Sequence, residues 1–316
     1  MNKGKYMKKI FLLVICFALT TSLFAISEDA GTTAFNFLNI PMGARGAGMG
    51  NTFTAIANDA LAPFWNPAGL PNIRERLLQI TYMNYFAGYS GGAVSYTMPL
   101  NEGTTIAFFS KFIGVGGIPK TEIDENQNLI LLGTFGSYDV LFGASYGKYL
   151  SDIINWGVNI KIISETIDEY SSQAVAADVC LLHQSPNPNL KVGLAAKNLG
   201  MQLSKFDQEK EKLPMTFTFG LAYKLNTGVI ALDINKPMHT DFYGTIGIET
   251  TFQNKIIVRA GYRSNANDWN VGSGIDFLSG ISAGVGFSWR DYKFDYAVNS
   301  YGELGFIHQL SVGYHF

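Results

Sequence analysis

The chain has 316 residues, and its 23 Lys and Arg residues against 25 Asp and Glu residues give a formal net charge of −2. The absence of a basic run excludes a nucleic-acid surface built on clustered cations, and no apolar stretch of about 18 residues beyond residue 25 predicts a spanning helix. The mean hydropathy of +0.11 is instead typical of strands in which only every other residue is apolar.

Residues 1–25 have the pattern of a cleaved secretory signal peptide. Residues 10–19 form an apolar run shorter than the roughly 20 residues of a spanning helix, and Ala25 lies at the expected cleavage point. The basic start contains four lysines, Lys3, Lys5, Lys8 and Lys9. Their removal leaves 19 basic against 25 acidic residues, a charge of about −6. We therefore predict an exported, acidic protein.

Residues 26–72 lack the alternation of a strand. They are rich in Gly and Ala, and they end near the turn dipeptide Asn66-Pro67. We predict a short helix from about Gly50 to Ala57. A compact segment of this kind lies either in the periplasm or inside a barrel, if a barrel follows. The small residues favour the lumen, because they let the backbone approach a barrel wall closely.

From residue 73 onward, large apolar residues alternate with polar or small ones. In 281–290, for example, one face carries Ile, Ala, Val, Phe and Trp, and the other carries Ser, Gly and Arg. A water-soluble sheet also alternates. Aromatic residues at the ends of several runs, opposite a face of Gly, Ser and mixed charge, favour a membrane barrel.

Fifteen segments have the length and pattern of a strand. They are 77–86, 88–99, 103–115, 137–150, 153–166, 171–184, 189–199, 213–225, 227–236, 241–252, 254–265, 269–277, 280–289, 291–299 and 304–316. Bacterial single-chain barrels have even strand numbers, so one candidate is wrong or one strand is counted twice. Two longer polar stretches, 116–135 and 200–214, are predicted as extracellular loops.

The C-terminal strand ends on an aromatic residue, which is typical of outer-membrane barrels. Leu310, Val312, Tyr314 and Phe316 share one face of this strand. We assign these four residues to barrel closure and to recognition by the barrel assembly machinery. The predicted fold is an all-β transmembrane antiparallel β-barrel (73–316) with an N-terminal luminal hatch, or plug (26–72), exported by a signal peptide (1–25).

The string GARGAGMGNTFTAIANDALAPFWNPAGL at 43–70 closely resembles the N-terminal signature of the PorV/PorQ family of outer-membrane proteins. More distantly it resembles the hatch of the FadL family of fatty-acid channels. The stretch from 280 to 316 is also similar to the closing strands of PorV-like barrels. The resemblance implies fourteen strands and a hatch inside the lumen.

The hatch signature, to which the resemblance gives a structural or gating role, consists of Gly43, Arg45, Gly46, Gly48, Gly50, Asp59, Asn66 and Pro67. Arg45 and Asp59 need partners inside a lumen, either each other or charges on the wall. The glycines provide close approach or positive φ, and Asn66-Pro67 provides the turn toward the first strand. The charges expected to point inward are mixed: Lys161, Asp178, Lys224, Glu249, Lys255, Arg259, Arg263, Asp276, Arg290, Lys293 and Asp295.

The sequence offers no catalytic constellation. His183, His239, His308 and His315 lack the spacing of metal ligands, and the glycines of 43–50 neither follow a strand nor end in Lys-Ser/Thr. Cys180 is expected to be a small buried strand residue. We expect no enzyme activity, no cofactor, no metal and no nucleic-acid partner.

Three functions are compatible with these residues. The main hypothesis is an outer-membrane barrel of PorV/PorQ type in a diderm bacterium, acting in protein secretion or attachment with secreted cargo or type IX components. The alternative is a FadL-like passive channel for hydrophobic small molecules such as fatty acids or hydrocarbons. The third is a structural envelope protein without ligand, in contact with outer-membrane lipid alone. An exposed apolar patch near 116–135 or 200–214 favours cargo, a lined cavity favours the channel, and a filled lumen favours the structural role.

Overall fold

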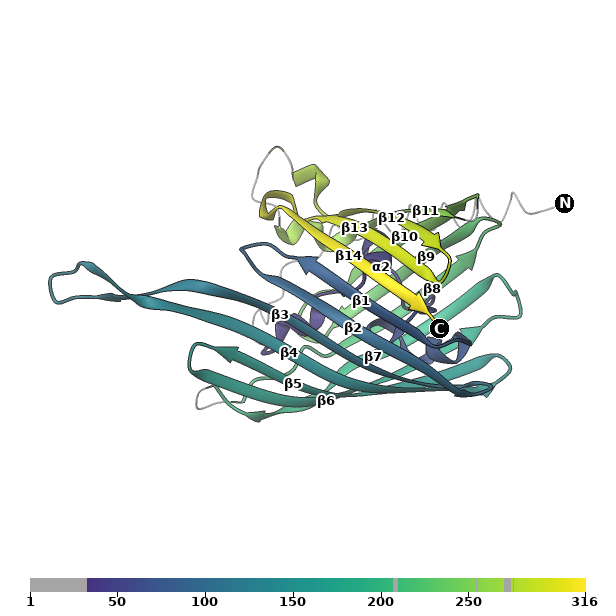
Figure 1. Cartoon of the computed structure of the whole chain (residues 1–316), viewed down its shortest axis with the longest axis horizontal. Coiled ribbons are helices and arrows are strands. Elements are labelled where there is room, and N and C mark those ends of the chain that lie inside the picture. Colours follow the sequence, from purple (N-terminus) through teal and green to yellow (C-terminus); the bar gives the residue numbers. More distant parts are fainter. Residues whose placement is uncertain (1–32, 207–209, 254, 270–273, 275) are drawn as a thin grey trace.

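The chain forms one closed antiparallel barrel (Figure 1). The computed structural model describes residues 33–206, 210–253, 255–269, 274 and 276–316, and fourteen strands lie within these ranges. Each strand pairs with its neighbours in sequence, and β1 pairs with β14 to close the barrel. The strands are β1 (Leu77–Asn84), β2 (Ser90–Asn101), β3 (Thr104–Ile123), β4 (Leu129–Ser151), β5 (Ile154–Ile167), β6 (Tyr170–Gln184), β7 (Leu190–Ser204), β8 (Thr216–Lys224), β9 (Gly228–Pro237), β10 (Tyr243–Phe252), β11 (Ile256–Arg263), β12 (Ile281–Trp289), β13 (Tyr292–Ser300) and β14 (Phe306–His315). The predicted all-β fold and its fourteen strands are confirmed.

The candidate strand 269–277 is wrong. Its described residues belong to two 3-10 helices, η4 (Ser264–Trp269) and η5 (Asp276–Leu278), apart from one turn residue, and the remainder lies outside the described residues. The physical reason is that β11 pairs directly with β12, with Tyr262 opposite Ile281. The connection between them therefore has no free barrel edge to join. A third short 3-10 helix, η6 (Gly302–Leu304), lies between β13 and β14.

The predicted loop at 116–135 is also wrong, because β3 and β4 stay paired far beyond the barrel. Ile118 lies opposite Phe135, and Ile123 lies opposite Leu129. The Asp124 carboxylate accepts the N–H groups of Asn126 and Asn128 at 2.9 and 2.7 Å, which fixes the turn at the tip. We call residues 116–135 the ribbon; it projects from one end of the barrel in Figure 1. Of the other predicted loop, residues 200–204 extend β7.

The two ends of the barrel differ. At the end opposite the ribbon, short turns join β2 to β3, β4 to β5 and β12 to β13, and the C-terminus lies there. Short turns mark the periplasmic end of outer-membrane barrels. Aromatic side chains gather on the outside of this end: Trp289 stacks on Tyr292, and Phe316 contacts Tyr314 and Tyr96. We call the two ends the ribbon end and the periplasmic end.

Side chains alternate between the outside and the lumen, as the sequence predicts. Along β12 the apolar Val285 and Phe287 are exposed, whereas Gly284 and Gly286 are buried against the interior. Cys180 is a buried strand residue packed with Leu182, as expected. None of the described helices is long and apolar enough to cross a membrane.

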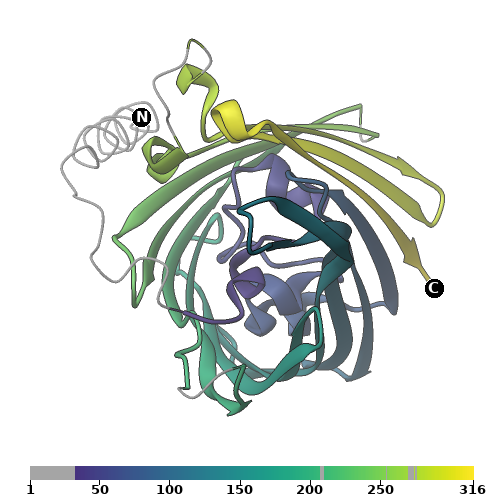
Figure 2. The same ribbon diagram turned by 90° about the vertical axis from the view of Figure 1, so that its left-hand side faces the viewer.

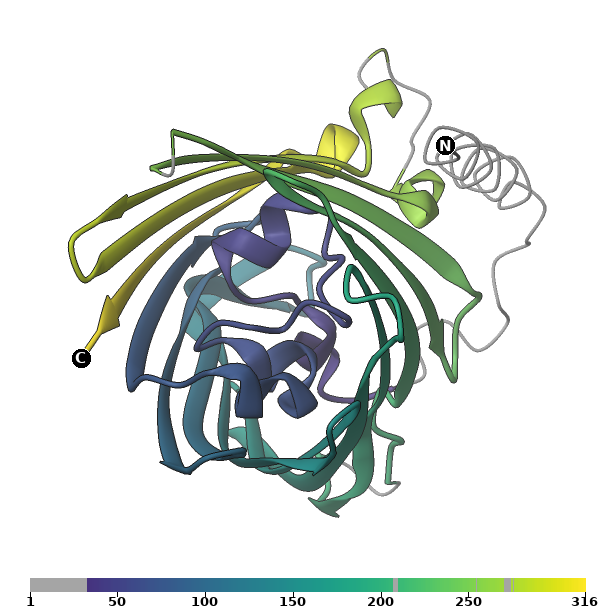
Figure 3. The ribbon, with the colours of Figure 1, turned by 90° about the vertical axis from the view of Figure 1, so that its right-hand side faces the viewer.

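Residues 33–72 fill the lumen, and we call them the hatch (Figures 2 and 3). Their helices are η2 (Asn36–Asn39), α2 (Ala44–Gly48), α3 (Ala62–Trp65) and η3 (Pro67–Asn72). The hatch begins at the ribbon end, where Thr33 forms a bridge with Lys212, and it continues into β1 at the periplasmic end. The predicted signal peptide lies outside the described residues.

The predicted helix from Gly50 to Ala57 is wrong. The helical turn lies just before it, in α2, and residues 50–57 form turns. The backbone explains this shift, because Gly50, Asn51 and Ala57 have φ angles of 68°, 66° and 28°. Three positive φ angles within eight residues are incompatible with a right-handed helix.

Candidate functional site

The strongest contact between hatch and wall is made by Arg45 of α2. Its Nε and Nη2 atoms each donate to a different oxygen of Glu249 on β10, at 2.8 Å. Its Nη1 atom donates to Asn58 at 2.8 Å and lies 3.3 Å from the Asp59 carboxylate. Burial alone would lower the pKa of Arg45, but Glu249 and Asp59 hold that pKa above its ordinary value. The guanidinium therefore stays charged.

The same charge network extends across the wall. Arg259 of β11 is fully buried, and it contacts Glu249 at 2.7 Å and Asp295 of β13 at 2.8 Å. We call Arg45, Asp59, Glu249, Arg259 and Asp295 the latch. Two cations and three carboxylates alternate in it, so that every charge faces an opposite one. The latch joins the hatch to three strands of the wall, β10, β11 and β13.

The predicted inward charges divide into three groups. Lys161, Asp178, Glu249, Arg259 and Asp295 are buried in the lumen, as predicted. Arg263 and Lys293 are partly buried. The other four are not buried in the lumen: Lys224 is exposed as the last residue of β8, Lys255 and Arg290 lie in turns, and Asp276 lies in η5.

The four hatch glycines each meet a backbone constraint. Gly43 and Gly50 have φ angles of 111° and 68°. A Cβ atom on Gly46 would lie 2.5 Å from the Trp65 ring, and one on Gly48 would lie 3.0 Å from the Cα atom of Gly284 on β12. Helix α2 therefore packs against the wall at backbone distance.

Asn66 and Pro67 start η3. The Asn66 side chain accepts the N–H of Ala68 at 3.0 Å, which caps this helix, and it donates to the carbonyl oxygens of Thr54 and Leu181 at 2.9 and 3.1 Å. Pro67 occupies the first helical position, where its missing N–H costs nothing. This corner fixes the hatch to β6 before the chain enters β1.

The four predicted closure residues lie on the outer face of β14, away from the latch. Leu310 lies opposite Tyr82 of β1, and the backbone N–H of Phe316 donates to the Arg76 carbonyl at 3.1 Å. The lumen face of the same strand has a second role. Gln309 and Ser311 accept the N–H groups of Gly43 and Ala44, both at 2.9 Å.

These anchors were not anticipated from the sequence. Asp233 of β9 is another, since its carboxylate accepts the N–H groups of Phe53 and Thr54 at 3.1 and 3.0 Å. Asn299 of β13 donates to the Ala47 carbonyl at 2.8 Å. The parity of the alternating strands was the available signal, because it places these side chains in the lumen.

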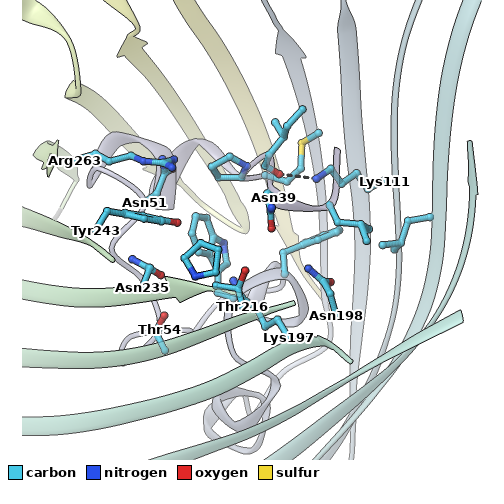
Figure 4. A pocket seen from close by; sticks show the side chains of 18 of the residues that line it. Asn39, Asn51, Thr54, Lys111, Lys197, Asn198, Thr216, Asn235, Tyr243 and Arg263 are labelled. Carbon is cyan, nitrogen blue, oxygen red and sulfur yellow. Dashed lines mark hydrogen bonds between the residues drawn. The ribbon is translucent and has the colours of Figure 1, made fainter. Parts of the chain in front are cut away.

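Two cavities lie on opposite sides of the latch. The larger, of about 260 Å³, lies toward the ribbon end between hatch and wall (Figure 4). Its apolar lining consists of three aromatic residues, Phe64 and Trp65 of the hatch and Phe109 of β3, together with aliphatic residues that include Leu38, Met42 and Leu141; eight Asn and Thr residues supply much of the polar lining. The smaller cavity, of about 100 Å³, lies toward the periplasmic end and is lined by Arg45 and Asp59.

The described residues contain no group of three or more His, Cys, Asp and Glu side chains arranged to hold a metal ion. A molecule in the larger cavity is separated from the smaller one by the hatch and its latch.

The fold resembles that of several solved β-barrel channels. The CymD monoaromatic hydrocarbon channel superposes with a TM-score of 0.64 at 11% identity, over 88% of this chain and 98% of that one. The fold is that of the FadL-like outer-membrane channels. The Pseudomonas putida toluene transporter TodX gives 0.58 at 12% identity, over 86% and 97% of the two chains. A Pseudomonas aeruginosa FadL homologue gives 0.58 at 11%, over 87% and 98%.

These likenesses show that the chain shares the fold of the three channels. No protein-family profile matches the sequence, and no curated protein matches it either. The narrower PorV/PorQ resemblance of residues 43–70 stays a prediction, since the structural neighbours bear on the fold alone.

Proposed function

We propose that this protein is a passive outer-membrane channel for small molecules with an apolar part, and that the hatch is its gate. The observation that carries the proposal is the pair of cavities separated by the latch. The lined cavity is the feature expected of a channel rather than of a purely structural barrel. CymD and TodX, which share the fold, are described as a hydrocarbon channel and a toluene transporter. The channel hypothesis is therefore better supported than the secretion hypothesis.

Passage would follow the lumen from the ribbon end to the periplasmic end. A molecule first contacts Phe64, Trp65 and Phe109 in the larger cavity. It then meets α2, which the contact of Arg45 with Glu249 ties to β10. Passage onward requires α2 to leave the wall, and the return of Arg45 to Glu249 closes the path again.

A reversible lock on α2 tests this route. Ala47 of α2 and Ala297 of β13 belong to one buried apolar cluster. Cysteines at both positions, Ala47→Cys and Ala297→Cys, are therefore introduced to join α2 to the wall through a disulfide, whose formation on oxidation is first verified by the loss of free thiols. We expect the oxidised double variant to stop uptake of a radiolabelled aromatic solute by cells, and reductant to restore it. Whole cells are used because their outer leaflet slows spontaneous entry. The single Ala297→Cys variant is the control, and undiminished uptake through the locked protein would contradict a hatch gate.

The ribbon favours a second candidate, a protein-binding barrel of PorV/PorQ type. Ile123, Leu129 and Leu131 are 68%, 71% and 64% exposed near its tip. The pairing of β2 ends at Gly114 and that of β5 ends at Ser137, so both ribbon edges are unpaired beyond these residues. Exposed edges with apolar side chains are templates for an added strand.

Shortening the ribbon separates the two candidates. In a variant whose residues 117–133 are replaced by a two-residue turn, solute uptake should stay unchanged, because the barrel ladder and the cavity are untouched. If the ribbon holds secreted cargo, the variant will lose export of proteins that carry a C-terminal sorting domain. Normal export from cells carrying the shortened ribbon would remove this candidate.

A further inference from the structure

The charged residues that line the larger cavity are all basic. Twenty-two residues line it, all of them described; four are Lys or Arg, and none carries a carboxylate. Lys111, Lys161 and Lys197 come from β3, β5 and β7, and Arg263 ends β11 (Figure 4). A neutral hydrocarbon forms no ion pair or hydrogen bond with these cations, and their desolvation by an apolar ligand would cost free energy.

Three of the four cations already have partners within the protein. Lys111 donates to the carbonyl oxygens of Phe37 and Ile40. Lys161 pairs with Asp178 at 2.6 Å, and the Arg263 guanidinium lies 4.3 Å from the centre of the Tyr243 ring. Lys111 thereby joins the wall to the hatch, whereas Lys161 and Arg263 contact other residues of the wall.

Lys197 differs from them. Among the residues that the structure describes, it has neither a hydrogen-bond partner nor an ion-pair partner. It is only partly buried, and it lines the cavity directly opposite Thr216 on β8. Figure 4 shows Lys197, Asn198 and Thr216 on one side of the cavity. Its ammonium interacts electrostatically with the Asp233 carboxylate but forms no ion pair with it. A partly buried ammonium without a directly contacting counter-ion is a ready site for an anion.

A second group in the cavity lacks a partner. The Oδ1 atom of Asn51 is buried and accepts no hydrogen bond from any described residue. Asn51 lines the same cavity, so a ligand that carries a hydroxyl or N–H group could satisfy this acceptor. The cavity therefore suits a molecule that carries both an anionic group and a hydrogen-bond donor.

The size of the cavity restricts that molecule further. A cavity of about 150 Å³ is enough to hold benzene, so the 260 Å³ found here fits one ring with one or two substituents. Phe64, Trp65 and Phe109 supply an apolar surface for such a ring. A long acyl chain would exceed this space and would face several Asn and Thr side chains without satisfying them.

We infer that the larger cavity binds a hydroxylated aromatic carboxylate, with its carboxylate at Lys197 and its ring against Phe64, Trp65 and Phe109. This inference rests on the proposed channel function and names its substrate class. It distinguishes this chain from channels for neutral hydrocarbons, because the charge of the ligand becomes the basis of selection.

Binding to the purified protein in detergent tests the inference, measured by calorimetry with 4-hydroxybenzoate and with neutral 4-hydroxybenzyl alcohol. We expect the anion to bind at least about tenfold more tightly than the alcohol, since hydrogen bonds to charged groups are the stronger ones. Lys197→Met should weaken anion binding by about tenfold or more without changing alcohol binding, and Lys197→Arg should restore it. Lys224→Met removes an exposed lysine at the end of β8 and should leave binding unchanged.

Equal affinity for the anion and the alcohol, or unchanged anion binding in Lys197→Met, would overturn the inference. Neither result would bear on the gate hypothesis, which is tested separately by measuring uptake through the disulfide-locked variant. Conversely, if the anion binds at Lys197 but the disulfide does not reduce uptake, the binding site is supported and the gated channel is contradicted. The failure of one proposal is thus distinguishable from the failure of the other.

Discussion

Replacing Arg45 by methionine is expected to release α2 from the barrel wall and to open the lumen. The substitution keeps much of the side-chain volume but removes both hydrogen bonds to Glu249 and those to Asn58 and Asp59. Breaking a buried ion pair on one side typically costs about 3–5 kcal/mol. Glu249 retains Arg259, so the lower end of that range applies here. We expect planar bilayers containing the variant to show frequent conducting openings that the wild-type protein lacks.

Two further variants distinguish a latch from a general loss of stability. Arg45→Lys keeps the charge but not the two-fold contact, so its openings should be intermediate in frequency. The double variant Arg45→Met/Glu249→Met removes both partners. Its loss of stability should be smaller than the sum of the losses of the two single variants. If the stability losses of the two single variants simply add in the double variant, or if Arg45→Met shows no conducting openings, the two residues do not act together as a latch.

Replacing Gly261 by valine is expected to displace the hatch while the barrel stays assembled. A Cβ atom on Gly261 would lie 2.1 Å from the backbone nitrogen of Gly50 and 2.2 Å from the carbonyl carbon of Met49. Neither atom is the end of a flexible side chain, so the hatch backbone itself must move. The wall strand is less affected, because valine suits a strand and the ladder of Gly261 with Gly247 and Ser282 uses only the backbone.

Hydrogen exchange measures this displacement directly. In Gly261→Val, amides of residues 43–57 should lose most of their protection from exchange, whereas amides of β10 to β12 should keep theirs. The electrophoretic mobility of the protein should still shift on heating, which shows that the barrel is folded. Gly313→Ala is the matched control, since a Cβ atom at that luminal position meets no atom nearer than 3.8 Å. Protection of the hatch equal to that of the wild type would show that the wall tolerates a side chain at Gly261.

Local patterns explain which parts of this fold were predictable. Strands alternate with a period of two residues, so the alternation alone identified all fourteen strands, and parity alone placed Glu249, Arg259 and Asp295 in the lumen. The pairing of Arg45 with Glu249 was not predictable in the same way, because 204 residues separate the two. Only the closed barrel brings them together.

The errors have a common physical origin in tertiary contacts. The hatch turns take their shape from the wall, so the helix at 44–48 could not be located from its own residues. The ribbon was missed because Gly116, Gly117 and Pro119 suggest a loop, whereas β-bulges near Val115 and Lys120 absorb them within a paired hairpin. The anchors Gln309 and Ser311 follow from parity once the hatch is known to reach them.

The position of the hatch also constrains the order of folding. Helix α2 contacts β11 to β14, whereas η3 contacts β3 to β6, so the hatch spans the first and last parts of the chain. Gly43 is synthesised early, but its acceptor Gln309 follows 266 residues later. Once β1 and β14 have joined, the hatch could enter only by being threaded through a narrow lumen. We therefore expect α2 to dock onto the late strands before or during the final pairing of β1 with β14 in the wild-type chain.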